Sequence, residues 1–162
     1  MKEKPVLVIG CGNPARGDDG LAPAFLERLD QLCLPGVETR YQYQLCVEDA
    51  MDMTGYGQVV YVDASLDAPP PFDFSPLPDD AEMHLDTHSI SPAALTYLAR
   101  TLFGATAGAY ILAIRGYRFD PFTETISEKA MQNLCEAISF FAERRISDQG
   151  VRSLSDQGDQ GI

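Results

Sequence analysis

Short apolar segments alternate along this chain with segments in which apolar residues recur at helical spacing. Residues 6–9 and 58–63 are mainly apolar runs rich in β-branched side chains, which are typical of strands buried on both faces. Further strands are predicted at residues 37–44 and 109–114, and helices at residues 21–32, 47–53, 92–104 and 127–142. Because strands joined by helices pair in parallel, this order predicts an α/β three-layer sandwich, with a mostly parallel, twisted, five-stranded sheet flanked by helices.

Two segments interrupt the alternation. Residues 66–86 hold five of the 11 prolines together with several acids, so we expect an irregular surface excursion, with residues 82–85 as a candidate short edge strand. Residues 147–162 repeat a Ser-Asp-Gln-Gly pattern and hold almost no core residues, so we expect a polar, disordered tail. The chain is therefore predicted to form a single α/β domain at residues 1–146, followed by this tail.

Charge and hydropathy exclude several classes of partner. The formal net charge is −12, and such a surface repels phosphate backbones, so no nucleic-acid partner is expected. No apolar run approaches the roughly 20 residues needed to cross a bilayer, and residues 6–9 are too few for a secretory signal. We therefore expect a cytoplasmic protein without membrane association. No apolar pattern indicates an obligate dimer, so a monomer is expected.

The four cysteines are Cys11, Cys33, Cys46 and Cys135. None of them forms a C-x-x-C pair, and their spacing fits neither a zinc site nor a dense disulfide framework. They are predicted to be reduced and mostly buried.

Side chains that carry chemistry follow two of the predicted strands and precede one of the helices. The Gly-rich segment 10–20, which contains Asp18 and Asp19, follows the first strand, Asp63 ends another strand, and His88 precedes a helix. In a parallel sheet the loops that leave the carboxyl ends of the strands share one edge, where ligands usually bind. Two carboxylates and an imidazole at that edge predict a site for a divalent cation, and the imidazole favours nickel or zinc over calcium.

Each of these residues also has a structural interpretation. Asp18 and Asp19 lie where a carboxylate would favour the positive end of the following helix, and Asp63 lies where turn residues are common. His88 would then satisfy a local backbone group. His84 lies four residues before His88, but the next helix begins after both, which disfavours a metal site made by this pair.

The spacing Gly10-x-Gly12-x-x-Ala15 after a strand also matches a loose dinucleotide-binding fingerprint. Two features disfavour it. Residues 40–44 contain no acidic side chain to bind a ribose. Two adjacent aspartates follow Ala15, where a pyrophosphate would need neutral amides. A nucleotide-binding α/β enzyme is therefore a minor hypothesis.

The motifs, taken in order, resemble those of the hydrogenase maturation protease family. The most specific element is Val-Ile-Gly-Cys-Gly-Asn at residues 8–13, followed by Asp-Asp-Gly at residues 18–20. A strand ending in Asp-Ala at residues 60–64 and a histidine segment at residues 87–92 come next. Residues 113–116 and 125–127 continue the same order, so the resemblance spans about residues 5–145.

The resemblance implies an endopeptidase that removes the C-terminal extension of a nickel-loaded hydrogenase large-subunit precursor. It assigns recognition of the nickel to Asp19, Asp63 and His88, with the nickel supplied by the substrate and no organic cofactor. The same three residues are the catalytic candidates, with Asp18 as a further one. Two routes stay open: polarisation of the scissile carbonyl by the metal, or general-base catalysis by an aspartate. The alternative function is a non-catalytic nickel-sensing chaperone of hydrogenase assembly.

Overall fold

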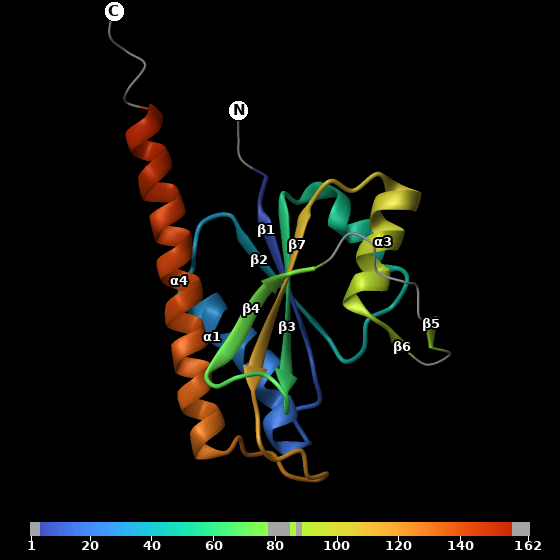
Figure 1. The fold of residues 1–162 in the computed structure, drawn as a ribbon, viewed down its shortest axis with the longest axis vertical. Coiled ribbons are helices and arrows are strands. Elements are labelled where there is room, and N and C mark those ends of the chain that lie inside the picture. Colours follow the sequence, from blue (N-terminus) through green and yellow to red (C-terminus); the bar gives the residue numbers. More distant parts are fainter. Residues whose placement is uncertain (1–3, 78–84, 87–88, 157–162) are drawn as a thin grey trace, which may run out of the picture.

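A five-stranded sheet forms the centre of the computed structural model, which describes residues 4–77, 85–86 and 89–156 (Figure 1). The strand order is β2-β1-β3-β7-β4. These strands are β1 (Val6–Cys11), β2 (Val37–Gln42), β3 (Gln58–Ser65), β4 (Phe72–Pro76) and β7 (Gly108–Arg115). Neighbours pair in parallel except β4, which is antiparallel to β7. The predicted fold class, with a mostly parallel sheet, is confirmed.

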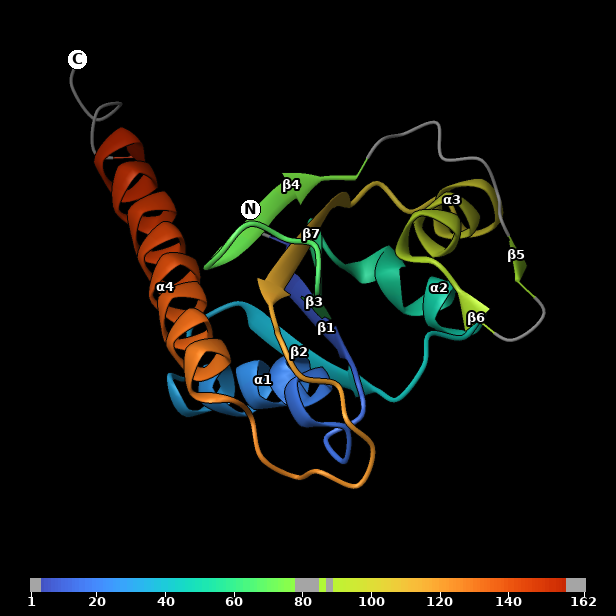
Figure 2. The same ribbon diagram turned by 60° about the horizontal axis from the view of Figure 1, so that its bottom comes forward.

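Helices cover both faces of the sheet, as Figures 1 and 2 show. One face carries α1 (Leu21–Gln31) and α4 (Glu128–Asp156), and the other carries α2 (Asp49–Asp52), the 3-10 turn η2 (Met53–Gly55) and α3 (Pro92–Phe103). Side chains along a strand alternate between the two faces. On β1, for example, Val8 joins the core under α1 and α4, whereas Ile9 joins the core under α3. The three-layer arrangement is therefore built on two separate hydrophobic cores.

The connections before α1 and α3 position the chemistry discussed below. A 3-10 turn, η1 (Gly17–Gly20), joins β1 to α1. A two-stranded ribbon of β5 (Leu85–Asp86) and β6 (Ser89–Ile90) precedes α3. Helix α3 begins as predicted, because the Ser91 hydroxyl accepts a hydrogen bond from the Ala94 amide at 3.1 Å and Pro92 takes the first helical position.

The fifth strand of the sheet lies in the segment that was predicted to be irregular. Strand β4 covers Phe72–Pro76 and forms the edge of the sheet beside β7. Of residues 82–85, the predicted edge strand, only Leu85 lies within the described residues, where it begins the separate ribbon. Two alternate side chains of β4 explain its position. Phe74 stacks on Tyr110 of β7 with ring centroids 5.3 Å apart, and Phe72 packs against Phe140 of α4 at 5.0 Å. This aromatic packing outweighs the proline content, and Pro76 at the strand's end is tolerated at a sheet edge.

Helix α4 continues past the domain boundary that was predicted after residue 146. It includes residues 147–156, which were assigned to the tail, while residues 157–162 lie outside the described part. Extending an existing helix avoids the cost of nucleation, so polar residues can follow a helix that the core already holds through Phe141. None of the helices in the described residues is long and apolar enough to cross a membrane.

The four cysteines are free, as predicted, but their predicted burial is wrong for most of them. Cys33, Cys46 and Cys135 are exposed, and Cys11 is half-buried. The exposed three lie at the end of α1, in the loop after β2 and on α4, where no second layer covers the chain. Only Cys11 packs against a hydrophobic core.

Candidate active site

A pocket of about 190 Å³ opens at the carboxyl ends of β1 and β3, on the face that carries α3. The strand register pairs Gly10 with Val62, so Cys11 and Asp63 follow side by side and share this face. The pocket is lined by Cys11, Gln44, Leu45, Tyr61, Val62, Asp63, Ser89, Ile90 and Pro92. It therefore lies at the sheet edge where the sequence predicted a site, and Asp63 lines it.

Asp63 has an electrostatic environment that disfavours its charge. Its side chain is accessible to solvent through the open pocket, but nearby protein atoms remove part of its hydration. This desolvation raises the pKa of Asp63 to about 6, a hydrogen bond from the Ala64 amide opposes the shift, and the charge of Asp19 adds to it. A carboxyl with a pKa near 6 can hold or release a proton close to neutral pH, as general acid–base chemistry requires.

Asp19 is placed by the tight loop that follows β1. The Asn13 amide donates a hydrogen bond to the Asp19 carboxylate at 2.9 Å. Gly12 allows this closeness, because a Cβ atom at this residue would lie only 2.1 Å from the Asp19 carbonyl oxygen. The charge of Asp19 also contributes to the raised pKa values of Asp63 and Cys11. Asp19 and Asp63 therefore act on each other electrostatically at one site.

The same contact bears on the nucleotide-binding hypothesis. In a dinucleotide-binding loop, free backbone amides after the strand face the pyrophosphate. Here the Asn13 amide is already bound to the Asp19 carboxylate, whose charge would repel a phosphate. The geometry of this loop thus opposes nucleotide binding, in agreement with the sequence argument.

Asp18 has a different role from its neighbour, and the predicted possibility that it is catalytic finds no support in its contacts. Its carboxylate is fully buried and accepts hydrogen bonds from the amides of Tyr117, Arg118 and Ser127 at 2.7–2.9 Å. The Ser127 hydroxyl donates a fourth bond at 2.7 Å. Burial alone would raise the pKa of Asp18, but these bonds together hold it below its usual value. Asp18 anchors the loop between β7 and α4.

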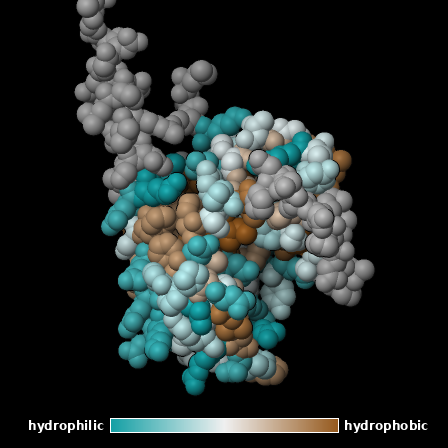
Figure 3. Space-filling model, viewed as in Figure 1, coloured by the Kyte–Doolittle hydropathy of each residue, from teal (hydrophilic) through white to brown (hydrophobic). Residues whose placement is uncertain are grey.

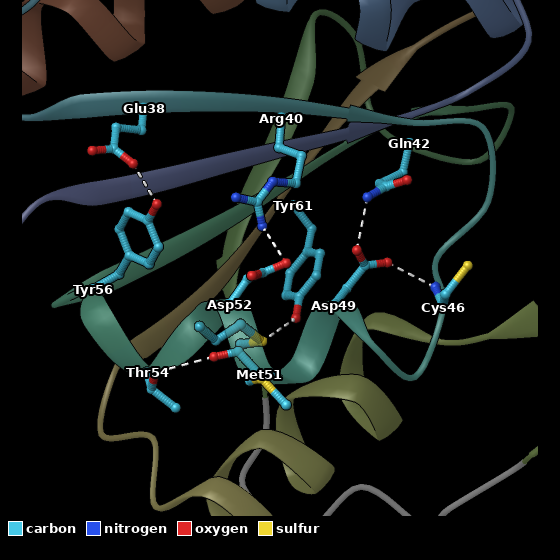
Figure 4. A network of polar contacts seen from close by, with 11 residues as sticks. Glu38, Arg40, Gln42, Cys46, Asp49, Met51, Asp52, Thr54, Tyr56 and Tyr61 are labelled. Carbon is cyan, nitrogen blue, oxygen red and sulfur yellow. Dashed lines mark hydrogen bonds and ion pairs between the residues drawn. The ribbon is translucent and has the colours of Figure 1, made fainter.

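One wall of the pocket is held by a carboxylate that the sequence did not single out. Asp49, at the start of α2, is buried and accepts hydrogen bonds from Gln42 at 2.7 Å and from the Cys46 amide at 2.8 Å. These bonds fix the turn that carries Gln44 and Leu45 into the pocket. Figure 4 shows that the alternate β2 residues Glu38, Arg40 and Gln42 each reach a polar partner in α2 or directly after η2. The partners are Tyr56, Asp52 and Asp49, respectively.

Cys11 is the second site residue that the sequence left unassigned. Burial first, and then the charges of Asp63, Asp49 and Asp19, raise the pKa of its thiol to about 12. The thiol is therefore neutral at physiological pH and is a poor nucleophile. The strand register was the signal that could have placed it, because a residue that ends β1 must lie beside the residue that follows Val62.

His88, the third predicted ligand, lies outside the described residues, as does His84. The described chain resumes at Ser89 and Ile90, which line the pocket. Among the residues that the structure describes, no three His, Cys, Asp or Glu side chains form a group able to hold a metal ion. Whether Asp19, Asp63 and His88 act together as metal ligands thus stays a prediction.

Comparisons with known proteins support the fold. No family model matches the sequence, and no curated protein matches it significantly. Among solved structures, the chain is similar to NiFe hydrogenase maturation protease HycI from Thermococcus kodakarensis KOD1, with a TM-score of 0.66 and 19% identity over 88% of this chain and 93% of that one. The hydrogenase 2 maturation peptidase of Thaumarchaeota archaeon SCGC_AB-539-E09 gives 0.63 and 23% over 87% and 97%.

The hydrogenase maturating endopeptidase HybD from E. coli gives a TM-score of 0.62 and 19% identity, over 95% of this chain and 94% of that one. The three matches cover 87–95% of this chain. The fold is thus the one expected from the motif resemblance. This chain has the fold of the hydrogenase maturation proteases.

Proposed function

We propose that the chain is an endopeptidase that removes a C-terminal extension from a hydrogenase large-subunit precursor, and that it recognises nickel held by that precursor. Three solved proteins with this fold are named as hydrogenase maturation proteases, peptidases or endopeptidases. The sequence motifs resemble the same family. In this proposal the protein acts in the cytoplasm as a monomer, with the precursor as its partner.

The observation that carries the proposal is the electrostatic coupling of two carboxylates beside an open pocket. Asp63 lines the pocket, and its pKa is raised by desolvation and by the charge of Asp19 in the neighbouring loop. Two like charges held close together attract a cation or a proton, and a pocket that is open on one side admits an extended chain. The combination supports a site that receives a metal-bearing protein segment from outside.

In this proposal each residue of the candidate site has a defined role. Asp19, oriented by the Asn13 amide, and Asp63 contribute negative charge toward the substrate's nickel, and His88 completes the proposed trio. Asp63, with a pKa of about 6, is the better candidate to take a proton from the attacking water. The nickel, when present, supplies Lewis acidity toward the scissile carbonyl. The thiol of Cys11 is neutral and serves as a wall of the pocket rather than as a nucleophile.

The test is to mix the purified chain with precursor, with and without inserted nickel, and to weigh the products by mass spectrometry. Asp19→Asn, Asp63→Asn and His88→Ala are expected to reduce cleavage at least a hundredfold, because each removes a charge or ligand from the proposed trio. Glu27→Gln is the matched control, since Glu27 is an exposed carboxylate on α1, which covers the face of the sheet opposite the pocket.

The outcomes separate the candidate functions. Loss of a C-terminal peptide from the nickel-loaded precursor alone supports the proposal. A precursor that forms a complex but keeps its length indicates the nickel-sensing chaperone. Normal cleavage by all three variants would overturn the assignment of the site. A melting temperature that rises with NAD or FAD would instead indicate the nucleotide-binding enzyme.

A further inference from the structure

Four exposed apolar side chains lie at the end of the sheet that carries the candidate active site, and we refer to Tyr41, Tyr43, Leu66 and Phe122 as the apolar rim. Their exposed fractions are 45%, 66%, 53% and 96%. Each lies at or after the carboxyl end of a parallel strand: the two tyrosines at β2, Leu66 after β3, and Phe122 after β7. Figure 3 shows a mostly hydrophilic face whose hydrophobic residues form separate areas, one of them in the lower part, where these strands end.

Phe122 is the most exposed member of the rim, and its backbone is unfavourable as well. Its φ angle is +61°, in the left-handed region that residues with a Cβ atom rarely occupy. The loop around it is nevertheless fixed. The Thr123 amide donates to the Ala15 carbonyl at 2.9 Å, and the Gly17 amide donates to the Thr123 carbonyl at 2.7 Å. A large apolar side chain kept exposed in a strained and fixed conformation indicates a functional constraint rather than a folding one.

The two tyrosines are fixed from the other side of the same loop. The Tyr41 hydroxyl donates to the Gly12 carbonyl at 2.8 Å. The side-chain amide of Asn13 donates to the Tyr43 hydroxyl at 3.1 Å. Their rings stay exposed while their polar ends are occupied, which is typical of aromatic residues at protein interfaces. Tyr41, Tyr43 and the segment of Phe122 are thus attached to residues 12–17, the loop that also orients Asp19.

We propose that the apolar rim is the surface on which a folded partner protein docks, with Phe122 inserting into a hydrophobic recess of that partner. The proposal rests on the proposed function, and the partner is the precursor whose chain end enters the pocket. Fixed aromatic side chains lose little conformational freedom on binding, so they are efficient anchors. Docking here would hold the precursor against the edge of the sheet that carries Asp19 and Asp63.

Charge distinguishes this partner from a second copy of the chain. Around Phe122 the exposed charges balance, because Arg16 and Arg118 offset Asp120 and Glu124. Beside Leu66, Asp63 and Asp67 add two exposed acids, so the loops of the rim carry more acids than bases. Two copies meeting through this edge would bring like charges together, in a chain of net charge −12. A partner with a neutral or basic surface around an apolar recess is complementary to it.

The experiment measures the Kd between the full-length chain and the nickel-loaded precursor by biolayer interferometry, at low and high salt. Phe122→Ala is expected to raise the Kd about tenfold or more, and Phe122→Leu, which keeps an apolar side chain, less than threefold. Phe103→Ala is the matched control. Phe103 is also exposed, but it lies at the end of α3, just before β7 begins and thus at the amino-terminal end of the strands. In the cleavage assay, Phe122→Ala should raise KM and leave kcat nearly unchanged.

Several results would overturn the docking surface. One is a Kd for Phe122→Ala equal to that of Phe103→Ala, in a wild-type chain that binds and cleaves. Others are the absence of any complex with wild type, and a wild-type dimer that Phe122→Ala dissociates, which would make the occupant a second copy. If wild type binds through Phe122 but cleaves nothing, the docking surface stands and the endopeptidase function fails.

Discussion

Two carboxylates near the carboxyl ends of the strands, Asp18 and Asp63, have opposite environments. Asp18 is fully buried and accepts four hydrogen bonds, three of them from backbone amides, so it stays ionised and holds a loop. Asp63 lines an open pocket, where desolvation first and then the charge of Asp19 raise its pKa. The first pKa is lowered and the second is raised, although Asp18 is the more buried of the two.

The difference shows that hydrogen-bond donors can outweigh desolvation: they do so at Asp18, whereas at Asp63 desolvation prevails. A carboxylate whose oxygen atoms are saturated by fixed donors has nothing left for a ligand, whereas one with few donors is available for chemistry. Asp18 and Asp19 are adjacent in the sequence and nevertheless have different environments. Asp19 accepts a hydrogen bond from the Asn13 amide and acts electrostatically on the pocket.

Replacing Asp18 is expected to have the largest effect on stability, and replacing Asp63 in parallel tests the comparison directly. Asp18→Ala would leave three buried amides and a hydroxyl without their acceptor, so we expect a loss of about 3–5 kcal/mol of stability and a Tm lower by roughly 10 °C. Asp63→Ala removes a charge that the folded state disfavours, so its Tm should equal or exceed that of wild type at neutral pH. Differential scanning calorimetry compares the two variants. Equal losses of stability would refute the division into anchor and site.

The substitution Gly12→Ala is expected to have the next largest effect on stability. In Gly12→Ala the new Cβ atom would lie 2.1 Å from the Asp19 carbonyl oxygen, at a φ of +158°, so the loop must shift. We expect a cost of roughly 2–4 kcal/mol in unfolding free energy, together with loss of cleavage, because Asp19 moves with the loop. Gly55→Ala is the control, since no atom lies within 4 Å of the place that its new Cβ would take, and it should change stability by about 1 kcal/mol or less. A Gly12→Ala chain as stable and as active as this control would show that the close approach is not required.

The pH dependence of stability should have opposite signs for the two carboxylates. In the unfolded chain both titrate near about 3.9. The pKa of Asp18 is lowered in the folded state. Its stabilising contribution is therefore complete above the unfolded pKa and is lost as pH falls through the folded pKa. Because the pKa of Asp63 is about 6, its destabilising contribution is complete above pH 6 and disappears as pH falls toward about 4.

Thermal unfolding from pH 3 to pH 8 separates these contributions. The Tm of Asp63→Asn minus that of wild type should be positive at pH 7.5 and shrink toward zero near pH 4. Wild type should lose stability below about pH 4 more steeply than Asp18→Asn, which has no carboxylate to protonate there. A constant difference between Asp63→Asn and wild type across this range would contradict the raised pKa.

The fold was largely predictable because its signals are local. Apolar runs placed β1 and β3, and Ser91 with Pro92 placed the start of α3. Strand β4 was missed because its reason lies elsewhere: Phe74 is held by Tyr110 of β7, and only the folded sheet brings the two together. Proline-rich composition was a misleading local cue.

The candidate site was predictable only in part, for the same reason. The proximity of Asp19 and Asp63 was predictable because the carboxyl ends of parallel strands share an edge, whereas their catalytic role stays a prediction. The role of Asp18 depends on amides about a hundred residues later in the chain, as the separation from Tyr117, Arg118 and Ser127 shows. Asp49 holds a pocket wall through side-chain contacts across β2 and α2, which no sequence spacing reveals.

The smallest expected effect concerns the tyrosine hydroxyls that hold the site loop. Tyr41→Phe removes one half-buried hydrogen bond, to the Gly12 carbonyl, and should cost about 1 kcal/mol. Tyr43→Phe removes an exposed bond to Asn13, which water can replace, and should cost less than about 0.5 kcal/mol. Chemical denaturation resolves the first from wild type. If the site loop is held by many weak contacts, unlike the Asp18 anchor, the double variant should lose no more than the sum of the two. A larger loss would mean that the two tyrosines hold the site loop cooperatively. The site loop and the loop anchored by Asp18 would then differ only in how strongly they are held.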